Sequence, residues 1–86
     1  MNTVHLKGIM GFPYYNGVDE CSFTLECPDN TYHLIIAKDT MRLKIYDYIW
    51  KSNFQQYDHV FIKGSLQYNS KNSAYILLSE IMHDAK

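Results

Sequence analysis

The residues of this chain with the clearest chemical potential are aromatic rings spaced among lysines. Its 86 residues include eight tyrosines. Tyrosine tolerates a half-exposed position well, because its ring packs while its hydroxyl stays in water. Exposed rings can stack on nucleobases, and nearby ammonium groups can contact phosphates. The composition is therefore compatible with a surface that recognises a single-stranded nucleic acid.

Catalysis and metal binding have almost no support in the sequence. There is no nucleophile elbow, no phosphate-binding glycine loop and no helical pair of metal ligands. The four histidines (His5, His33, His59 and His83) are dispersed along the chain, and no close acidic pair suggests acid–base work. We therefore expect a protein that is not an enzyme and that holds no cofactor and no metal.

The two cysteines indicate a reducing compartment. Cys21 and Cys27 lie six residues apart in one predicted strand, which separates them by roughly 20 Å, too far for a disulfide. Their spacing also matches no zinc-ligand pair. The N-terminus lacks the apolar run of a signal peptide, and no stretch approaches a membrane span. We expect a cytoplasmic protein that makes no membrane contact.

The net charge of −1 is close to neutral. This balance argues against a strongly basic nucleic-acid module. Four acids (Asp19, Glu20, Glu26 and Asp29) lie within residues 19–30 without a base, whereas residues 31–72 carry a weak positive excess. An acidic hairpin next to a weakly basic segment is compatible with either a nucleic-acid or a protein partner.

Alternation of apolar and polar residues predicts strands, and a change of period predicts one helix. Residues 11–20, 28–30 and 69–73 are rich in Gly, Pro, Asn or Ser and are predicted loops or turns. Asp39 or Thr40 can cap the helix, which is expected to run to about Ser52. The predicted strands are residues 3–10, 21–27, 31–37, 59–68 and 74–82, with the helix between the third and the fourth.

Two glycines in the predicted strands indicate how the sheet is shaped. Gly8 and Gly64 occupy core-facing positions, where glycine lets a strand bend sharply. Five strands are too few for a stable flat sheet with two open edges, and closure into a barrel removes the edges. We predict a single domain, residues 1–86, that is all-β with one helix: a five-stranded oligonucleotide/oligosaccharide-binding (OB) barrel. The alternative is a small α+β sheet with the helix across one face.

The predicted helix has two apolar stripes. Met41, Ile45 and Ile49 would close the barrel end. The opposite stripe is either shielded by loop residues or forms a protein–protein contact, and Phe61, on the outward row of its strand, needs a subunit or a base to cover it. We assign Leu43, Tyr46, Trp50 and Phe61 to an oligomer interface.

Several segments resemble the bacterial single-stranded-DNA-binding (SSB) family. "VFIKGSLQY" looks like the fourth strand of that family, "NTVHLKGIM" like its opening strand and "NTYHLIIA" like its third strand. The ending "YILLSEI" looks more like the closing strand of the related primosomal protein PriB. The resemblance implies an OB fold, single-stranded DNA binding and a homodimer or homotetramer.

The candidate nucleic-acid contacts come from this resemblance and from the predicted loops. Tyr32 matches the stacking aromatic of the family, and Lys38 stands where the family often carries a second one. If Tyr32 were instead a core residue on the row of Leu34 and Ile36, His33 would face outward. One of the two tyrosines in the first loop could fold back onto the core. The candidates are Tyr32, His33, Tyr14, Tyr15, Tyr68, Lys71, Lys7 and Lys38.

Two functions are compatible with these features. The first is a non-catalytic SSB-like protein that binds single-stranded DNA, or RNA, without strong sequence preference, acts in DNA replication or recombination with a replication-protein partner, and is encoded by a phage or mobile element. The second is an OB-fold protein-interaction module, such as a PriB-like primosome adaptor or a host-factor inhibitor. The near-neutral charge and the acidic hairpin favour the second.

Overall fold

The computed structural model describes residues 2–15, 19–51, 58–69 and 73–83, except for the side chains of Trp50, Lys51 and Ser73. Its elements follow the predicted order, with ends that differ by one or two residues. Among the described residues, the one addition is a two-residue strand inside the segment predicted to be a loop. The elements are β1 (Thr3–Met10), β2 (Tyr14–Tyr15), β3 (Glu20–Glu26), β4 (Tyr32–Lys38), α1 (Thr40–Lys51), β5 (His59–Asn69) and β6 (Ser73–His83).

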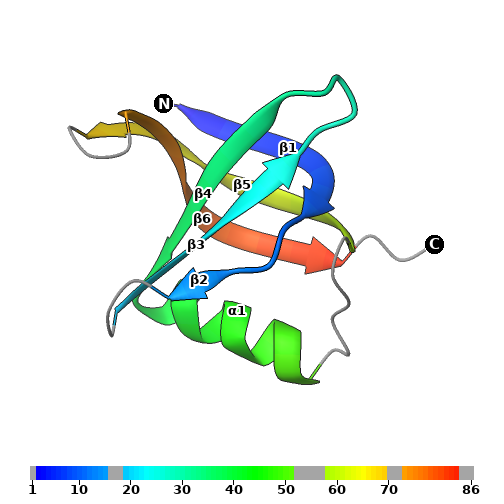
Figure 1. Ribbon diagram of the computed structural model, residues 1–86. Coiled ribbons are helices and arrows are strands. Elements are labelled where there is room, and N and C mark those ends of the chain that lie inside the picture. Colours follow the sequence, from blue (N-terminus) through cyan, green and yellow to red (C-terminus); the bar gives the residue numbers. More distant parts are fainter. Residues whose placement is uncertain (1, 16–18, 52–57, 70–72, 84–86) are drawn as a thin grey trace.

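The long strands close into a barrel (Figure 1). The sheet runs β1-β5-β6-β4-β3-β2, and an additional pairing of β1 with β3 joins its two sides. The β4–β6 pair is parallel, and the other pairs are antiparallel. This five-stranded barrel, with the helix between β4 and β5, is the predicted OB arrangement. The alternative of an open α+β sheet is therefore wrong.

Both predicted strand glycines lie where two main chains approach closely. A Cβ atom at Gly8 would collide with the Glu26 carbonyl oxygen, next to the β1–β3 pairing that closes the barrel. A Cβ atom at Gly64 would collide with the Leu77 carbonyl oxygen. The pairing of β5 with β6 also shifts register between Lys63 and Gly64, which marks a β-bulge. Each glycine thus permits a sharp bend by leaving room for a neighbouring strand.

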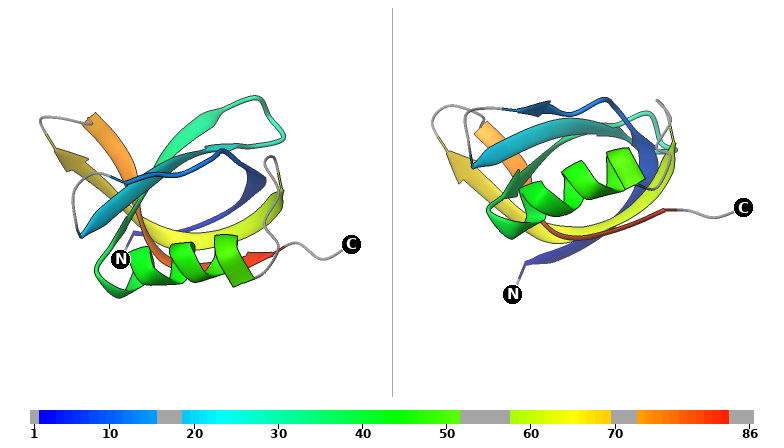
Figure 2. Two further views of the ribbon diagram at one scale, coloured as in Figure 1. Left: turned by 60° about the horizontal axis from the view of Figure 1, so that its bottom comes forward. Right: turned by 90° about the horizontal axis from the view of Figure 1, so that it is seen from below.

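One end of the barrel is closed by α1 (Figure 2). Met41 and Ile45 are buried in the core cluster, and Tyr48 and Ile49 pack against it. The inward row of the barrel is made mainly of alternate apolar side chains, as the sequence predicted for β3. The core cluster contains Met10, Cys21, Phe23, Leu25, Cys27, Ile35, Ala37, Val60, Ile62, Ile76 and Leu78 besides the helical residues.

The turn between β3 and β4 is fixed by hydrogen bonds. The Cys27 amide donates to the Thr31 carbonyl oxygen at 2.9 Å, and the Asn30 amide donates to the Cys27 carbonyl oxygen at 3.0 Å. Asn30 has a φ of 65°, a left-handed conformation that asparagine tolerates better than most residues. The Asp29 carboxylate accepts from the Thr31 hydroxyl at 2.6 Å and from its amide at 3.2 Å. This rigid hairpin lies at the opposite end of the barrel from α1 (Figure 1).

Candidate nucleic-acid interface

The outer face of β3 and β4 carries Tyr32, the strongest sequence candidate. Tyr32 lies opposite Glu26, and Leu34 lies opposite Thr24. Residues directly opposite in a sheet share a face, and Leu25, the residue of β3 between the two outward positions, is buried. The Tyr32 side chain is 68% exposed. The alternative of a core position for Tyr32 is therefore wrong.

The inward row of β4 consists instead of Ile35 and Ala37, with His33 at its open end. His33 lies opposite Leu25 and is half-buried. Its Nε2 lies 3.2 Å from the Thr31 hydroxyl. The expectation that His33 would face outward depended on Tyr32 being inward, and it is wrong for the same reason.

The two tyrosines of β2 separate onto different faces. Tyr14 lies opposite Ser22, on the same outer face as Tyr32, and it is 73% exposed. Tyr15 lies opposite the buried Cys21, and burial raises the pKa of its phenol. Only Tyr14 therefore presents its ring fully on the outer face.

The hairpin of β5 and β6 extends beyond the barrel (Figure 1). Tyr68 lies opposite Ala74, and Leu66 lies two residues before it on the same face. Leu66 and Ala74 line a shallow depression of about 130 Å³ together with Tyr32 and His33. Tyr68, itself 73% exposed, shares the face of Leu66 and Ala74, the two hairpin residues that line this depression. Lys71 lies outside the described residues.

Positive charge near this surface is weak. The Lys38 ammonium lies 4.0 Å from the Glu20 carboxylate, directly across β3–β4. Lys7 is on β1, where its ammonium lies 5.4 Å from the centre of the Phe61 ring. Neither lysine adjoins Tyr32 in the sheet, so the rings rather than the cations dominate the surface.

The residues assigned to an oligomer interface come from two elements. Leu43 and Tyr46 are about half exposed on the outer side of α1, as the second apolar stripe predicted. Phe61 lies opposite Met82 on the outer face of β5 and β6, and both side chains are exposed. Trp50 lies in the last turn of α1, and its side chain is outside the part of the chain that the structure describes.

Sequence reasoning missed the residues that complete these surfaces. Glu26, Thr24 and Leu34 flank Tyr32, and Tyr75 lines the depression beside it. The register of the β3–β4 hairpin is the signal that could have found the first three, because a turn at residues 28–30 places Glu26 opposite Tyr32.

The described residues contain no group of three or more potential ligands that could hold a metal ion. They likewise include no helix that is both long and apolar enough to cross a membrane.

Solved structures with the same fold include single-stranded-DNA-binding proteins. The SSB domain of a protein from Synechococcus sp. superposes with a TM-score of 0.76 at 13% identity, covering 96% of each chain. The second single-stranded-DNA-binding protein of Mycobacterium smegmatis superposes with a TM-score of 0.72 at 12% identity, covering 96% of this chain and 88% of that one.

Proteins of another kind share the fold as well. The OBody NL8, bound to hen egg-white lysozyme, superposes with a TM-score of 0.71 at 16% identity, covering 100% of this chain and 97% of that one. No protein-family model matches the sequence, and no match is found among curated proteins. At these identities the similarity establishes the OB fold.

Proposed function

We propose that this protein binds single-stranded DNA, or RNA, without catalysis and without a strong requirement for base sequence. The observation that carries the proposal is the exposure of Tyr14 and Tyr32 on the outer face of β2, β3 and β4, with the exposed Tyr68 on the neighbouring β5–β6 hairpin. Large exposed apolar patches mark interaction sites, and an exposed aromatic ring can stack on any base. Solved structures with this fold include proteins described as single-stranded-DNA-binding.

The path of a bound strand follows from the positions of the rings. Tyr14 lies at the same level of the sheet as Ile36, whose own side chain is buried, because both residues lie opposite Ser22. Ile36 lies four positions after Tyr32 along β4, or roughly 13 Å, which leaves room for bases between the two rings. Leu66 and Ala74 line the depression next to Tyr32, and Tyr68 follows on their face of the β5–β6 hairpin. A strand that crosses β3 and β4 thus meets Tyr14 and Tyr32, and a segment that continues over the depression reaches the β5–β6 hairpin, which carries Tyr68.

The proposal extends to the cellular role. We place the protein in DNA replication or recombination, as a homodimer or homotetramer in the cytoplasm with a replication-protein partner. Its composition, rich in Lys, Asn, Ile and Tyr, fits an AT-rich genome and leads us to propose a phage or mobile-element origin.

The test is fluorescence anisotropy with labelled oligo(dT), combined with size-exclusion light scattering. We expect binding at low salt. We also expect a shallow decrease in affinity as salt rises, because binding that neutralises few phosphates releases few counterions. A steep salt dependence would mean that cations rather than rings carry the affinity.

The second candidate function is a protein-interaction module. It is favoured by the acids on the same surface: Glu26 lies opposite Tyr32, and Glu20 lies beside Lys38. The OBody NL8 has the same fold and is bound to a protein, lysozyme. A folded and monodisperse sample that shows no oligo(dT) binding at low salt would favour this function over the first.

A further inference from the structure

A row of four side chains crosses the barrel from Tyr32 to β5. Tyr32 lies opposite Glu26, Glu26 lies opposite Ile9, and Ile9 lies opposite His59. Opposite residues share a face of the sheet, so these four side chains lie side by side on the outer surface of β4, β3, β1 and β5. A strand that stacks on Tyr32 therefore has a continuous route toward β1.

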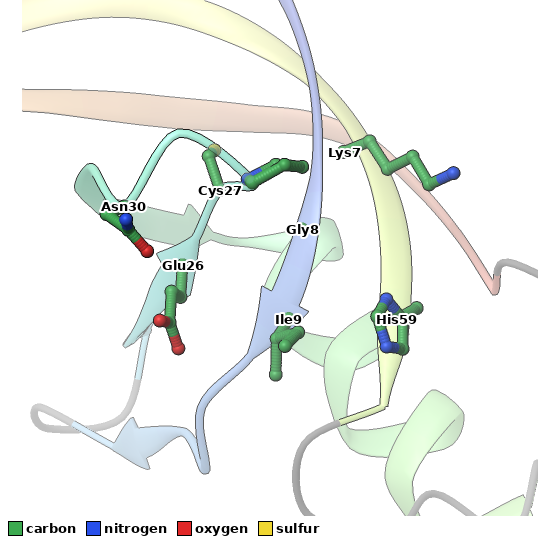
Figure 3. Close-up of a pocket in the computed structure, with 8 residues that line it drawn as sticks. Lys7, Gly8, Ile9, Glu26, Cys27, Asn30 and His59 are labelled. Carbon is green, nitrogen blue, oxygen red and sulfur yellow. The ribbon is translucent and has the colours of Figure 1, made fainter.

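This row ends at a cavity of about 280 Å³ (Figure 3). Ile9, Cys27 and Pro28 provide apolar walls, and the polar groups come from Glu26, Asn30, Lys7 and His59. Figure 3 shows Glu26, Cys27 and Asn30 on one side of β1, and Lys7 and His59 on the other. Pockets for drug-sized ligands measure about 300–1,000 Å³. This cavity lies just below that range, so it can hold one small planar ring.

The wall formed by the β3–β4 turn is rigid before any ligand arrives. Its backbone hydrogen bonds and the contacts between Asp29 and Thr31 hold Asn30 in its left-handed conformation. Binding therefore requires little ordering of this segment, which reduces the entropic cost of recognition.

The polar groups beside the apolar walls indicate which ring fits. Within the described part of the chain, neither the Glu26 carboxylate nor the Asn30 carboxamide makes a hydrogen bond or an ion pair. An ionised carboxylate only accepts hydrogen bonds. Guanine is the one DNA base whose pairing edge carries two adjacent donors, N1–H and the 2-amino group. Adenine and cytosine place an acceptor next to their amino donor, and thymine flanks its single donor with two carbonyl oxygens.

We propose that this cavity is a guanine subsite, in which Glu26 accepts from the two donors of a base in the strand that stacks on Tyr32. The inference rests on the proposed nucleic-acid binding and adds a base preference at one position. The Asn30 carboxamide can donate to the guanine O6 atom, next to N1–H. Lys7, at the other side of β1, lies where a phosphate of the same strand can pass.

The test compares labelled oligothymidylate with an oligomer of the same length in which isolated guanines replace every fourth thymine, so that no quadruplex forms. We expect the guanine-containing strand to bind about fivefold tighter or more, which corresponds to one bidentate base contact. Inosine in place of guanine lacks the 2-amino group and should lose most of this preference. Adenine in the same places should behave like thymine.

Two variants assign the preference to this cavity. Glu26→Gln replaces one acceptor by a donor and should bring the ratio of the affinities for the two strands close to one. Asn30→Gly keeps the left-handed turn conformation accessible and should reduce the ratio in part. Glu80→Gln, on the outer face of β6, removes a carboxylate elsewhere on the barrel and should leave the ratio unchanged.

The possible failures can be told apart. Oligothymidylate binding with equal affinity for the guanine-containing strand would overturn the subsite and leave the proposed function standing. A guanine preference that survives in Glu26→Gln would also overturn it. If the folded wild-type protein binds neither strand, both proposals are overturned.

Discussion

Gly8 faces the main chain of Glu26 where β1 meets β3, and no side chain fits between them. Gly8→Ala would place a methyl group against the Glu26 carbonyl oxygen, so the strands must separate where the barrel closes. We expect the free energy of unfolding to fall by about 1–3 kcal/mol, the usual cost of overpacking, as measured by urea denaturation. Thr3→Ala, an exposed change in the same strand, is the control and should cost little.

An unchanged stability in Gly8→Ala would show that the contact with Glu26 is not needed for closure. The variant should also lose protection from hydrogen exchange first at Ile9 and Met10, because these residues form the β1–β3 pairing. A uniform loss across all strands would instead indicate that the whole barrel is destabilised together.

The barrel could be predicted from the sequence because two signals point to the same fold. The period-two pattern predicts short strands, and the two glycines in the core-facing rows predict strands that bend enough to close. The inward face of β4 could not, because Leu34, Ile35 and Ile36 are consecutive apolar residues that fit either parity. Pairing with β3 decides it, and that register places Tyr32 outward. The short strand β2 was missed because two tyrosines between turn residues show no alternation. The cavity beside Gly8 combines β1, β5 and the β3–β4 turn, so no local pattern indicates it.

The Cys21 thiol should be unreactive toward thiol reagents in the folded protein. Burial raises the pKa of its thiol to about 11, so at pH 8 the reactive thiolate is almost absent. Because the folded state favours the protonated thiol, its contribution to the free energy of unfolding is fully present below the ordinary thiol pKa. This contribution is lost as the pH rises through the pKa of the thiol in the folded protein. Cys27→Ser, which leaves Cys21 alone, should react with Ellman's reagent only after urea is added.

The matched variant Cys21→Ser leaves Cys27, which lines the cavity beside β1. Burial raises the pKa of this thiol too, but the reagent can reach it from the cavity. We expect slow labelling of the native protein. Equal labelling rates for the two variants would contradict the difference in burial between them.

The pKa of the Asp29 carboxyl is lowered by the hydrogen bonds that it accepts from the Thr31 hydroxyl and amide. A lowered pKa stabilises the turn above the ordinary carboxyl pKa, and this contribution is lost as the pH falls through the folded value. Thr31→Val removes the hydroxyl donor and should raise the Asp29 pKa, as measured by an NMR pH titration. Asp29 pKa values that coincide in the two proteins would exclude this hydrogen bond as the cause.

The exposed stripe of α1 predicts self-association. Leu43 and Tyr46 present apolar surface on the side of the helix away from the core, and a second copy of the chain would cover it. We expect the wild-type protein to run as a homodimer or homotetramer in size-exclusion light scattering. Leu43→Glu combined with Tyr46→Glu should lower the mass, whereas Lys44→Glu, at an exposed position between them, should not. A wild-type protein that is monomeric in this measurement would show that the stripe does not mediate self-association.

Tyr32 should contribute more to strand binding than to folding. Its ring is 68% exposed and lies opposite Glu26 on the outer face, so Tyr32→Ala removes a stacking surface and leaves no cavity. Stacking on one base is worth about 1–3 kcal/mol, and we expect the affinity for oligo(dT) to fall more than tenfold in fluorescence anisotropy. Tyr32→Phe keeps the ring and should bind nearly as well as the wild type. A loss of folded structure in Tyr32→Ala, detected by a lower thermal midpoint, would assign the ring to stability instead.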